Sequence, residues 1–321
     1  LYLFHFYAFR ARRRLKDSLR RPFRWLKGAL TSRRAYAHIP PAPGEASARD
    51  RVVWDRLSDQ PHQHTGKWTR LGIRLRDAPE HFRELAAAAG ALPRIRGRYR
   101  ELRGELYRRP APFSGLGIAL RPWRQDPEAQ LVAVEELGLR QVLLRLHPWE
   151  EDHGAEEELA RELHGRGYEL AFALPQNREL VRDRERWRSA VSELGERFRP
   201  YGRHFQVGQA VNRSKWGVWT YREYLEMAAV AAEILRVDEE VEILGPAVID
   251  FELQATASIL NLPAGSLRFD AVSSLLYVDR RGAPESRQLG FDAADKAVLL
   301  RAIAETSRSG SPRSWITEVN W

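Results

Sequence analysis

The stretch QVLLRLHPWEEDHGAEEELARELHGRGYELAFALP, residues 141–175, decides the fold. It contains two apolar runs, QVLLRLH (141–147) and YELAFALP (168–175), which are separated by the polar, charge-rich run EEELARELHGRG (156–167). The apolar runs are nearly continuous, which indicates strands buried on both faces. A strand, a helix and a second strand in this order predict two parallel neighbours in one sheet.

The same alternation runs from residue 110 to the end of the sequence. Seven apolar runs predict strands: FSGLGIAL (113–120), QVLLRLH (141–147), YELAFALP (168–175), HFQVGQAV (204–211), VEILGPAV (241–248), FDAVSSLLYV (269–278) and SWITEVNW (314–321). Helix candidates between them include PEAQLVAVEELG (127–138), REYLEMAAVAAEIL (222–235) and FDAADKAVLLRAIAETSRSG (291–310). The repeated unit predicts an α/β fold with a parallel sheet.

Seven strands and six helices fit either a doubly wound sheet or a barrel. The first strand carries Gly115 and Gly117, but a third glycine is missing and Pro122 follows, so the phosphate-binding turn of a nucleotide-binding sheet is not matched. We therefore expect a (β/α)8 TIM-type barrel with seven visible strands. The sequence stops at the tip of the seventh strand, so we expect the eighth to be missing from it.

The basic residues are concentrated at the amino terminus. The net charge is +9, but residues 1–36 hold eleven basic side chains and one acidic one, while the other 285 residues hold 41 basic and 42 acidic. We divide the chain into a basic amphipathic helical segment with a linker (1–48), a helical N-terminal region (49–109) and the barrel (110–321). The nearly neutral barrel argues against a nucleic-acid partner. The segment 1–36 either contacts an anionic membrane surface or packs on the barrel.

Targeting and cofactor signals are sparse. The apolar start LYLFHFYAF precedes RARRRLK, whereas a signal peptide has its basic residues first. This order favours a cytoplasmic or peripheral-membrane location over secretion. The chain has no cysteine, which excludes disulfides and thiolate metal sites. We expect no cofactor and no metal site.

Polar and aromatic residues cluster where the predicted strands end. In a barrel of this type the active site lies at the carboxyl ends of the strands. Aromatic platforms together with amide, guanidinium and imidazole groups suit a neutral, polyhydroxylated ligand such as an oligo- or polysaccharide. The residues from which we expect sugar contacts are Arg145, His147, Trp149, Gln209, Asn212, Trp216, Tyr277 and Trp321.

Two of these strand ends carry a resemblance to a known family. SWITEVNW (314–321) and FQVGQAVNRSKWG (205–217) resemble the seventh and fourth strands of the clan of retaining (β/α)8-barrel glycoside hydrolases, most of all its xylosidase and iduronidase-like branch and bacterial polysaccharide-hydrolase relatives. The resemblance covers roughly residues 110–321. It implies that the protein hydrolyses O-glycosidic bonds, in a bacterial cell-surface glycan for example, with Glu318 as nucleophile and Tyr277 beside it.

The fourth-strand motif departs from the clan at its decisive position. The clan's general acid/base glutamate is replaced by Ala210, and the asparagine before it by Gln209, while Asn212 matches. A retaining glycosidase needs two carboxyl groups about 5 Å apart, and alanine can neither donate nor accept a proton.

Three explanations for Ala210 remain open. Another carboxylate may act as the acid, the barrel may be a non-catalytic carbohydrate-binding pseudoenzyme, or a glutamate may have been replaced by engineering. The atypical Gln209 and Val211 beside it argue against a single engineered change. The carboxylates that could take over the acid role are Glu150, Glu151, Asp152, Glu252 and Asp279.

Overall fold

The computed structural model describes most of the unit Val52–Trp321, one of two compact units into which the chain divides. The predicted segment 1–48, Tyr277, Asp279 and Trp321 lie outside the described residues. The described ranges are 53–55, 59–62, 67–106, 108, 113–122, 127–250, 252–276 and 287–319.

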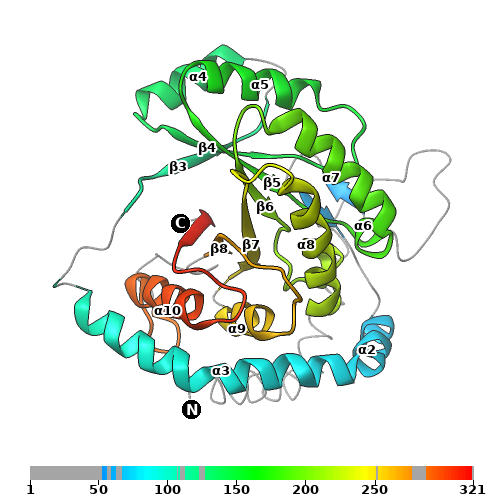
Figure 1. The fold of residues 1–321 in the computed structure, drawn as a ribbon, viewed down its shortest axis with the longest axis vertical. Helices are drawn as coiled ribbons and strands as arrows, with labels where there is room; N and C mark the ends of the chain where they lie inside the picture. The colour runs from blue at the N-terminus through cyan, green and yellow to red at the C-terminus, as the bar shows by residue number, and fades with distance from the viewer. Residues whose placement is uncertain are drawn as a thin grey trace, which may run out of the picture. The chain divides into compact units, whose positions relative to one another are not determined.

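Seven parallel strands form one sheet in which strand order follows chain order (Figure 1). Every strand lies within one of the seven predicted apolar runs or overlaps it. The strands are β3 (Gly117–Leu120), β4 (Gln141–Arg145), β5 (Glu169–Leu174), β6 (His204–Val207), β7 (Glu242–Ile249), β8 (Ala271–Leu275) and β9 (Ser314–Glu318). The prediction of a parallel sheet with sequential neighbours is confirmed.

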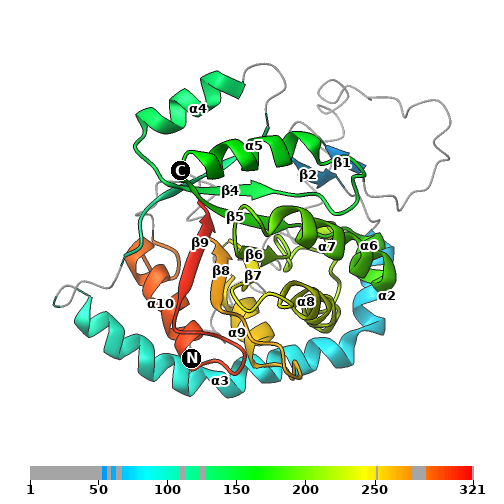
Figure 2. The ribbon, with the colours of Figure 1, turned by 45° about the horizontal axis from the view of Figure 1, so that its top comes forward.

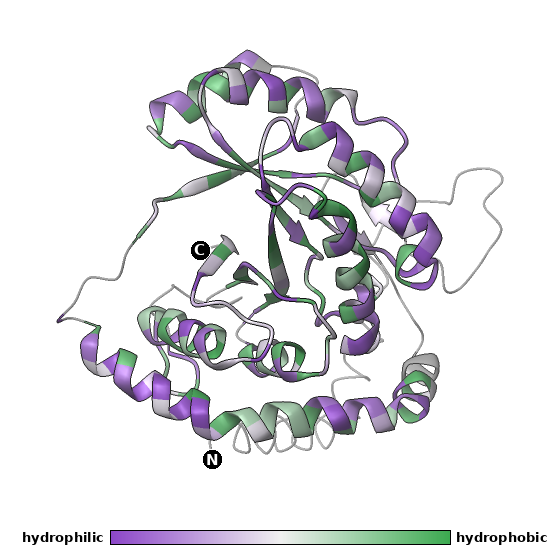
Figure 3. Cartoon of the chain, in the orientation of Figure 1, coloured by the Kyte–Doolittle hydropathy of each residue, from purple (hydrophilic) through white to green (hydrophobic). Residues whose placement is uncertain are grey.

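Helices connect the strands and cover the outer face of the sheet (Figure 2). They are α4 (Pro127–Glu136), α5 (Gly154–Gly165), α6 (Arg178–Arg182), α7 (Arg184–Phe198), α8 (Tyr221–Leu235), α9 (Leu253–Asn261) and α10 (Ala293–Thr306). β5, β6 and β8 are buried along nearly their whole length. Figure 3 shows the resulting contrast between mostly hydrophobic strands and helices with mixed surfaces. Continuous burial explains why these strands do not alternate polar and apolar residues.

The sheet curls until its last strand faces its middle strands. Thr317 on β9 donates a hydrogen bond to the side chain of Gln206 on β6 (2.5 Å), although β7 and β8 lie between these strands. β3 and β9 are the edge strands, and no strand joins them among the residues described here. The described chain is therefore a nearly closed, seven-stranded TIM-type α/β barrel, as the sequence predicts.

Residues before the barrel form two helices and a hairpin. α2 (Lys67–Arg76) leads into α3 (Ala78–Glu105), which runs along α9 and α10 (Figure 1). Glu84 of α3 accepts a hydrogen bond from the Tyr221 backbone at the start of α8 (2.7 Å), and Arg98 pairs with Glu305 of α10 (2.5 Å). The region also contains an antiparallel hairpin, β1 (Val53–Asp55) and β2 (Gln60–His62), that the sequence analysis did not anticipate. No helix in the described ranges is long and apolar enough to cross a membrane.

Candidate functional site

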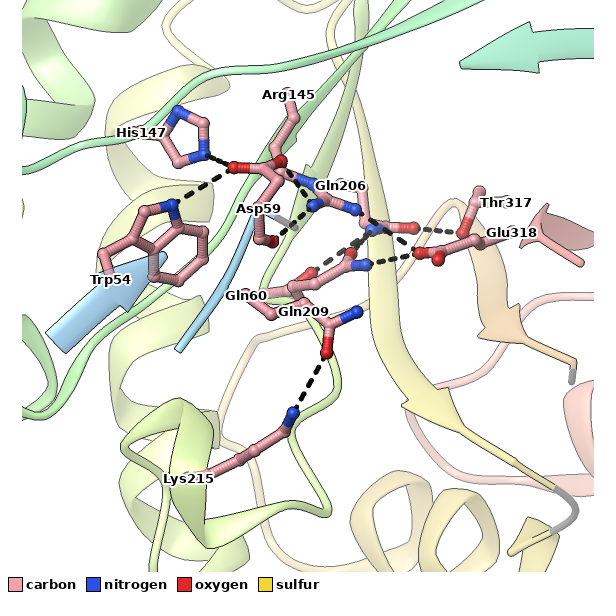
Figure 4. A network of polar contacts seen from close by, with 11 residues as sticks. Trp54, Asp59, Gln60, Arg145, His147, Gln206, Gln209, Lys215, Thr317 and Glu318 are labelled. Atoms are coloured by element: carbon pink, nitrogen blue, oxygen red, sulfur yellow. Dashed lines mark hydrogen bonds and ion pairs between the residues drawn. The ribbon is translucent and has the colours of Figure 1, made fainter. Parts of the chain in front are cut away.

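Polar side chains from four separate segments meet at the carboxyl ends of the strands (Figure 4). Glu318 ends β9, Arg145 ends β4, Gln209 follows β6, and Asp59 comes from the turn of the β1–β2 hairpin. These segments are far apart in sequence, and the curl of the sheet brings their ends together. We call this region the barrel mouth.

Glu318 is held by two donors. Its Oε2 accepts a hydrogen bond from Gln209 Nε2 (2.7 Å) and a longer contact from Arg145 Nη2 (3.4 Å). The Glu318 side chain keeps 30% of its surface exposed. The carboxylate is therefore fixed in orientation yet open to solvent, as a group that contacts a ligand must be.

A chain of buried amides fixes the orientation of Gln209. Gln206 donates to Gln209 Oε1 (3.0 Å), so the Gln209 amide nitrogen is the group turned toward Glu318. The backbone of Gln209 is held in turn by Gln176, which accepts from its N–H (2.9 Å) and donates to its carbonyl (3.0 Å). Gln176, Gln206 and Gln209 are all buried. Because these buried amides form hydrogen bonds with one another, Gln209 is held rigidly in place.

Asp59 joins the hairpin to the barrel. Its carboxylate pairs with Arg145 Nη1 (2.5 Å) and His147 Nε2 (2.7 Å), and it accepts a hydrogen bond from Trp54 Nε1 (3.2 Å). Burial on its own raises the pKa of Asp59. The hydrogen bond from His147 and the charge of Arg145 outweigh that effect and hold the pKa well below the usual range of an aspartate. Asp59 is therefore a carboxylate at neutral pH.

An aromatic cluster stands beside this ion pair. The Trp54 ring lies 4.5 Å from Trp149, 5.4 Å from Trp216 and 5.2 Å from His147, measured between ring centroids. Trp54 and Trp149 are partly exposed, whereas Trp216 and His147 are buried. The buried Trp216 ring thus packs against Trp54, and the accessible aromatic surface of this cluster belongs to Trp54 and Trp149.

Ala210 lies in a small cluster of buried apolar side chains. It is fully buried, in a cluster with Trp216, Ala247 and Leu275, and its backbone φ is +47°. The position at which the resemblance places a general acid is thus filled by hydrocarbon. A carboxyl group introduced there would lose its contact with water.

Asn212 has a local structural role. Its side chain accepts from the Ile249 N–H (2.9 Å), donates to the Ile249 carbonyl (3.0 Å) and donates to Glu252 (3.0 Å). These bonds tie the end of β7 to the loop after β6. The expected sugar contact by Asn212 has no direct test in this geometry and stays a prediction.

Three further carboxylates on the mouth side have partners among the described residues. Arg213 pairs with Asp250 and with Glu252 (3.0 Å), and although burial lowers the pKa of Arg213, these two carboxylates raise it above its ordinary value. Asp152 accepts from the Gly154 N–H (2.9 Å) before α5. Within the described ranges no three His, Asp or Glu side chains converge as a metal site.

The structure brings Glu318, Gln209, Arg145, His147 and Trp149 together at the barrel mouth, and their roles toward a sugar stay predictions. It adds Asp59 and Trp54, which could not be selected from the sequence because both precede the barrel. The one signal was indirect, since Arg145 leaves a strand end with a positive charge that calls for an acid. Glu318 at the end of β9 meets Arg145 at 3.4 Å, and Asp59 from the hairpin is the closer acid and also contacts His147.

Comparison with known proteins adds little. No protein-family model matches the sequence, and no curated protein matches it. Among solved structures, a GH30 endoxylanase from Clostridium papyrosolvens C71 is similar over 52% of this chain, with 12% sequence identity and a TM-score of 0.40. The match spans 50% of that enzyme, so this chain corresponds to about half its length.

Proposed function

We propose that the barrel mouth binds an oligo- or polysaccharide without hydrolysing it. The observation that carries this proposal is the burial of Ala210 among Trp216, Ala247 and Leu275, at the position that the motif resemblance to retaining glycosidases assigns to the acid/base. Both retention and inversion need a second carboxyl group that can exchange a proton. Alanine, buried among apolar side chains, cannot supply this second carboxyl group.

The lining of the mouth suits a sugar. Trp54 and Trp149 offer partly exposed rings, and apolar ring faces pack well on sugar C–H surfaces. Gln209, Arg145 and Glu318 offer donors and an acceptor that are already held in place by their neighbours. Fixed polar groups beside an aromatic platform are the usual composition of a small-ligand site.

Two acids near the mouth, Asp59 and Glu252, are poorly suited to replace the lost one. Asp59 is ionised and bound by Arg145 and His147, so it has no proton to give at neutral pH. Glu252 is bound by Asn212 and Arg213. Each of these carboxylates would have to leave its partners before acting as an acid.

Hydrolysis with Glu318 as nucleophile is the second candidate function. Glu318 favours it because the side chain ends the seventh strand, is partly exposed and is oriented by Gln209 and Arg145. A barrel with a nucleophile but no acid has a distinctive chemistry. It can attack only substrates whose leaving group departs without protonation, and an added anionic nucleophile such as azide can replace the missing base.

Calorimetric titration with a panel of oligosaccharides tests binding. We expect at least one neutral or acidic oligosaccharide to bind the wild type, and Gln209→Ala to weaken it because Glu318 loses its shortest hydrogen bond. Arg188→Gln on the exposed face of α7 is the matched control and should leave binding unchanged. Binding that is the same in Gln209→Ala would refute the mouth as the binding site.

Hydrolysis is measured on the same panel and on dinitrophenyl glycosides. The binding proposal predicts no turnover of natural glycans. If dinitrophenyl glycosides are cleaved, if azide accelerates that cleavage, and if Glu318→Gln abolishes it, Glu318 is a nucleophile without an acid. Cleavage of natural glycans that depends on Glu318 would overturn the non-catalytic proposal.

We also propose that residues 1–36 contact an anionic membrane surface. The support is their charge alone, since eleven of these side chains are basic and one is acidic. Sedimentation with phosphatidylserine vesicles should fall when Arg12, Arg13 and Arg14 are changed to glutamine. Unchanged sedimentation would contradict this proposal.

A further inference from the structure

A pocket lined by arginines lies apart from the residues of the barrel mouth. It encloses about 530 Å³ between α2, α6, the start of α7 and α8, and its lining residues are Arg76, Arg178, Val181, Arg182, Arg184, Trp219, Glu223 and Glu226. Four arginines and two glutamates give this lining a formal charge of +2. We call it the rim pocket.

The wall of the rim pocket is built around Arg178. Its guanidinium donates to both carboxylate oxygens of Glu223 (2.8 and 3.0 Å) and to the Gly217 carbonyl (2.9 Å). It also lies over the Trp219 ring, 3.7 Å from the centroid. Glu223 additionally accepts from the Trp219 N–H (2.9 Å). The charge of Glu223 is thus neutralised within the wall and does not repel an incoming anion.

Other arginines leave the pocket with a positive excess. Arg184 pairs with Glu226, and Glu226 also binds Arg222 (3.0 Å), which does not line the pocket. Arg76 is exposed, pairs with its neighbour Asp77 (2.8 Å) and lies 5.6 Å from the Trp219 centroid. Arg182 has no hydrogen-bond or ion-pair partner in the part of the chain that the structure describes. Its guanidinium is therefore available to a ligand.

The rim pocket and the mouth share two short segments of chain. Gln176 holds Gln209 at the mouth, and Arg178, two residues later, lines the pocket. Trp216 packs against Trp54 on the mouth side, and Trp219, three residues later, lines the pocket. The two sites are therefore linked through residues 176–178 and 216–219, which is the reason to consider one ligand for both.

From this arrangement we propose that the rim pocket binds the carboxylate of an acidic sugar, so that the glycan held at the mouth is an anionic one. This rests on the proposed function, which supplies the glycan. The planar donor fork of arginine matches a carboxylate in two parallel hydrogen bonds, and the pocket presents one such fork, Arg182, that has no partner among the described residues, in a lining whose other arginines add positive charge. Inorganic phosphate offers the same acceptor chemistry and serves as a separate probe.

The test compares a short oligogalacturonate with its methyl ester by calorimetry. The two ligands have the same backbone and differ in charge. We expect the wild type to bind the acid about ten-fold more tightly than the ester, which corresponds to about 1.4 kcal/mol. Arg182→Gln with Arg184→Gln should abolish that preference, and Arg188→Gln, outside the pocket, should preserve it.

The variants separate this inference from the proposed function. Gln209→Ala should weaken acid and ester equally, because it changes the mouth alone. If the arginine variants remove the preference while Gln209→Ala changes nothing, the rim pocket stands and the mouth proposal fails. Equal binding of acid and ester by the wild type, or an unchanged preference in the arginine variants, overturns the rim pocket. Binding of neither oligomer overturns the rim pocket as a site for an acidic sugar, whereas the mouth proposal falls only if the whole oligosaccharide panel fails to bind. Binding of inorganic phosphate without oligomer binding would assign the pocket to a free anion.

Discussion

Replacing Asp59 by asparagine tests whether the hairpin is held in the mouth by charge. The substitution keeps the shape of the side chain and removes the negative charge that Arg145 (2.5 Å) and His147 (2.7 Å) share. The Asp59 side chain is 17% exposed, so water replaces its partners only in part. Hydrogen bonds to charged groups contribute about 1.5–3 kcal/mol, and the retained amide oxygen preserves some of that. We expect Asp59→Asn to lower the free energy of unfolding by about 2 kcal/mol at neutral pH.

The pH dependence of this difference gives a second, independent check. Because the folded-state pKa of Asp59 lies below its unfolded value of about 3.9, its charge stabilises the fold fully above that value. The stabilisation is lost as the pH falls toward the folded-state pKa. The wild type and Asp59→Asn should therefore differ most at neutral pH and converge as the pH drops below about 4.

Thermal unfolding followed by circular dichroism measures both quantities. A loss of 2 kcal/mol corresponds to a decrease in Tm of about 5 °C for a unit of this size. Asp238→Asn is the control, because Asp238 is exposed and bonds only a nearby backbone N–H in the described structure. A Tm within 1 °C of wild type (about 0.5 kcal/mol or less), or a difference that grows on acidification, would refute the assigned role of Asp59.

Four further substitutions probe the site and its supports. Trp216→Ala removes a nearly fully buried ring that packs against Trp54. The cavity should destabilise the protein by about 3–5 kcal/mol, measured by urea unfolding. Gly217→Ala should lower the free energy of unfolding by roughly 3 kcal/mol, because the φ of Gly217 is +95° and a Cβ there would collide with the backbone nitrogen of Arg178. Gly138→Ala, at φ +66° with open space around it, should cost only about 1 kcal/mol, and equal losses at the two glycines would contradict the steric argument. Thr317→Val leaves the buried side-chain oxygen of Gln206 (Oε1) without its donor from β9. The free energy of unfolding should fall by about 1–3 kcal/mol, whereas an unchanged urea midpoint would mean that this bond is not formed.

The order and direction of the strands were open to prediction because the signal is local. The nearly continuous apolar runs QVLLRLH (141–147) and YELAFALP (168–175) indicate buried strands, and the intervening helix forces them to be parallel. Burial is nearly continuous along β5, whereas β4 alternates between buried and half-buried residues. Each of the seven runs contains or overlaps a strand of the sheet. The prediction that polar side chains gather where strands end follows from the same logic, since parallel strands end at one edge.

The hairpin was not open to prediction from the same signals. VWD (53–55) and QPH (60–62) are three residues each, too short for a periodic pattern, and they lie in a region that otherwise reads as helical. Their place at the mouth depends on Arg145 and His147, which come some 85 residues later. Contacts across such a separation leave no trace in local sequence.

The sequence by itself determined that Glu318 ends the seventh strand of a parallel α/β fold and that Ala210 stands where an acid/base is expected. Only the tertiary structure decided the surroundings of these two residues. The curl of the sheet brings Gln209 and Arg145 to Glu318, buries Ala210 beside Trp216, and draws Asp59 into the mouth. The physical reason is range: strand and helix patterns are set by neighbours along the chain, whereas burial, ion pairing and the pKa of Asp59 are set by neighbours in space.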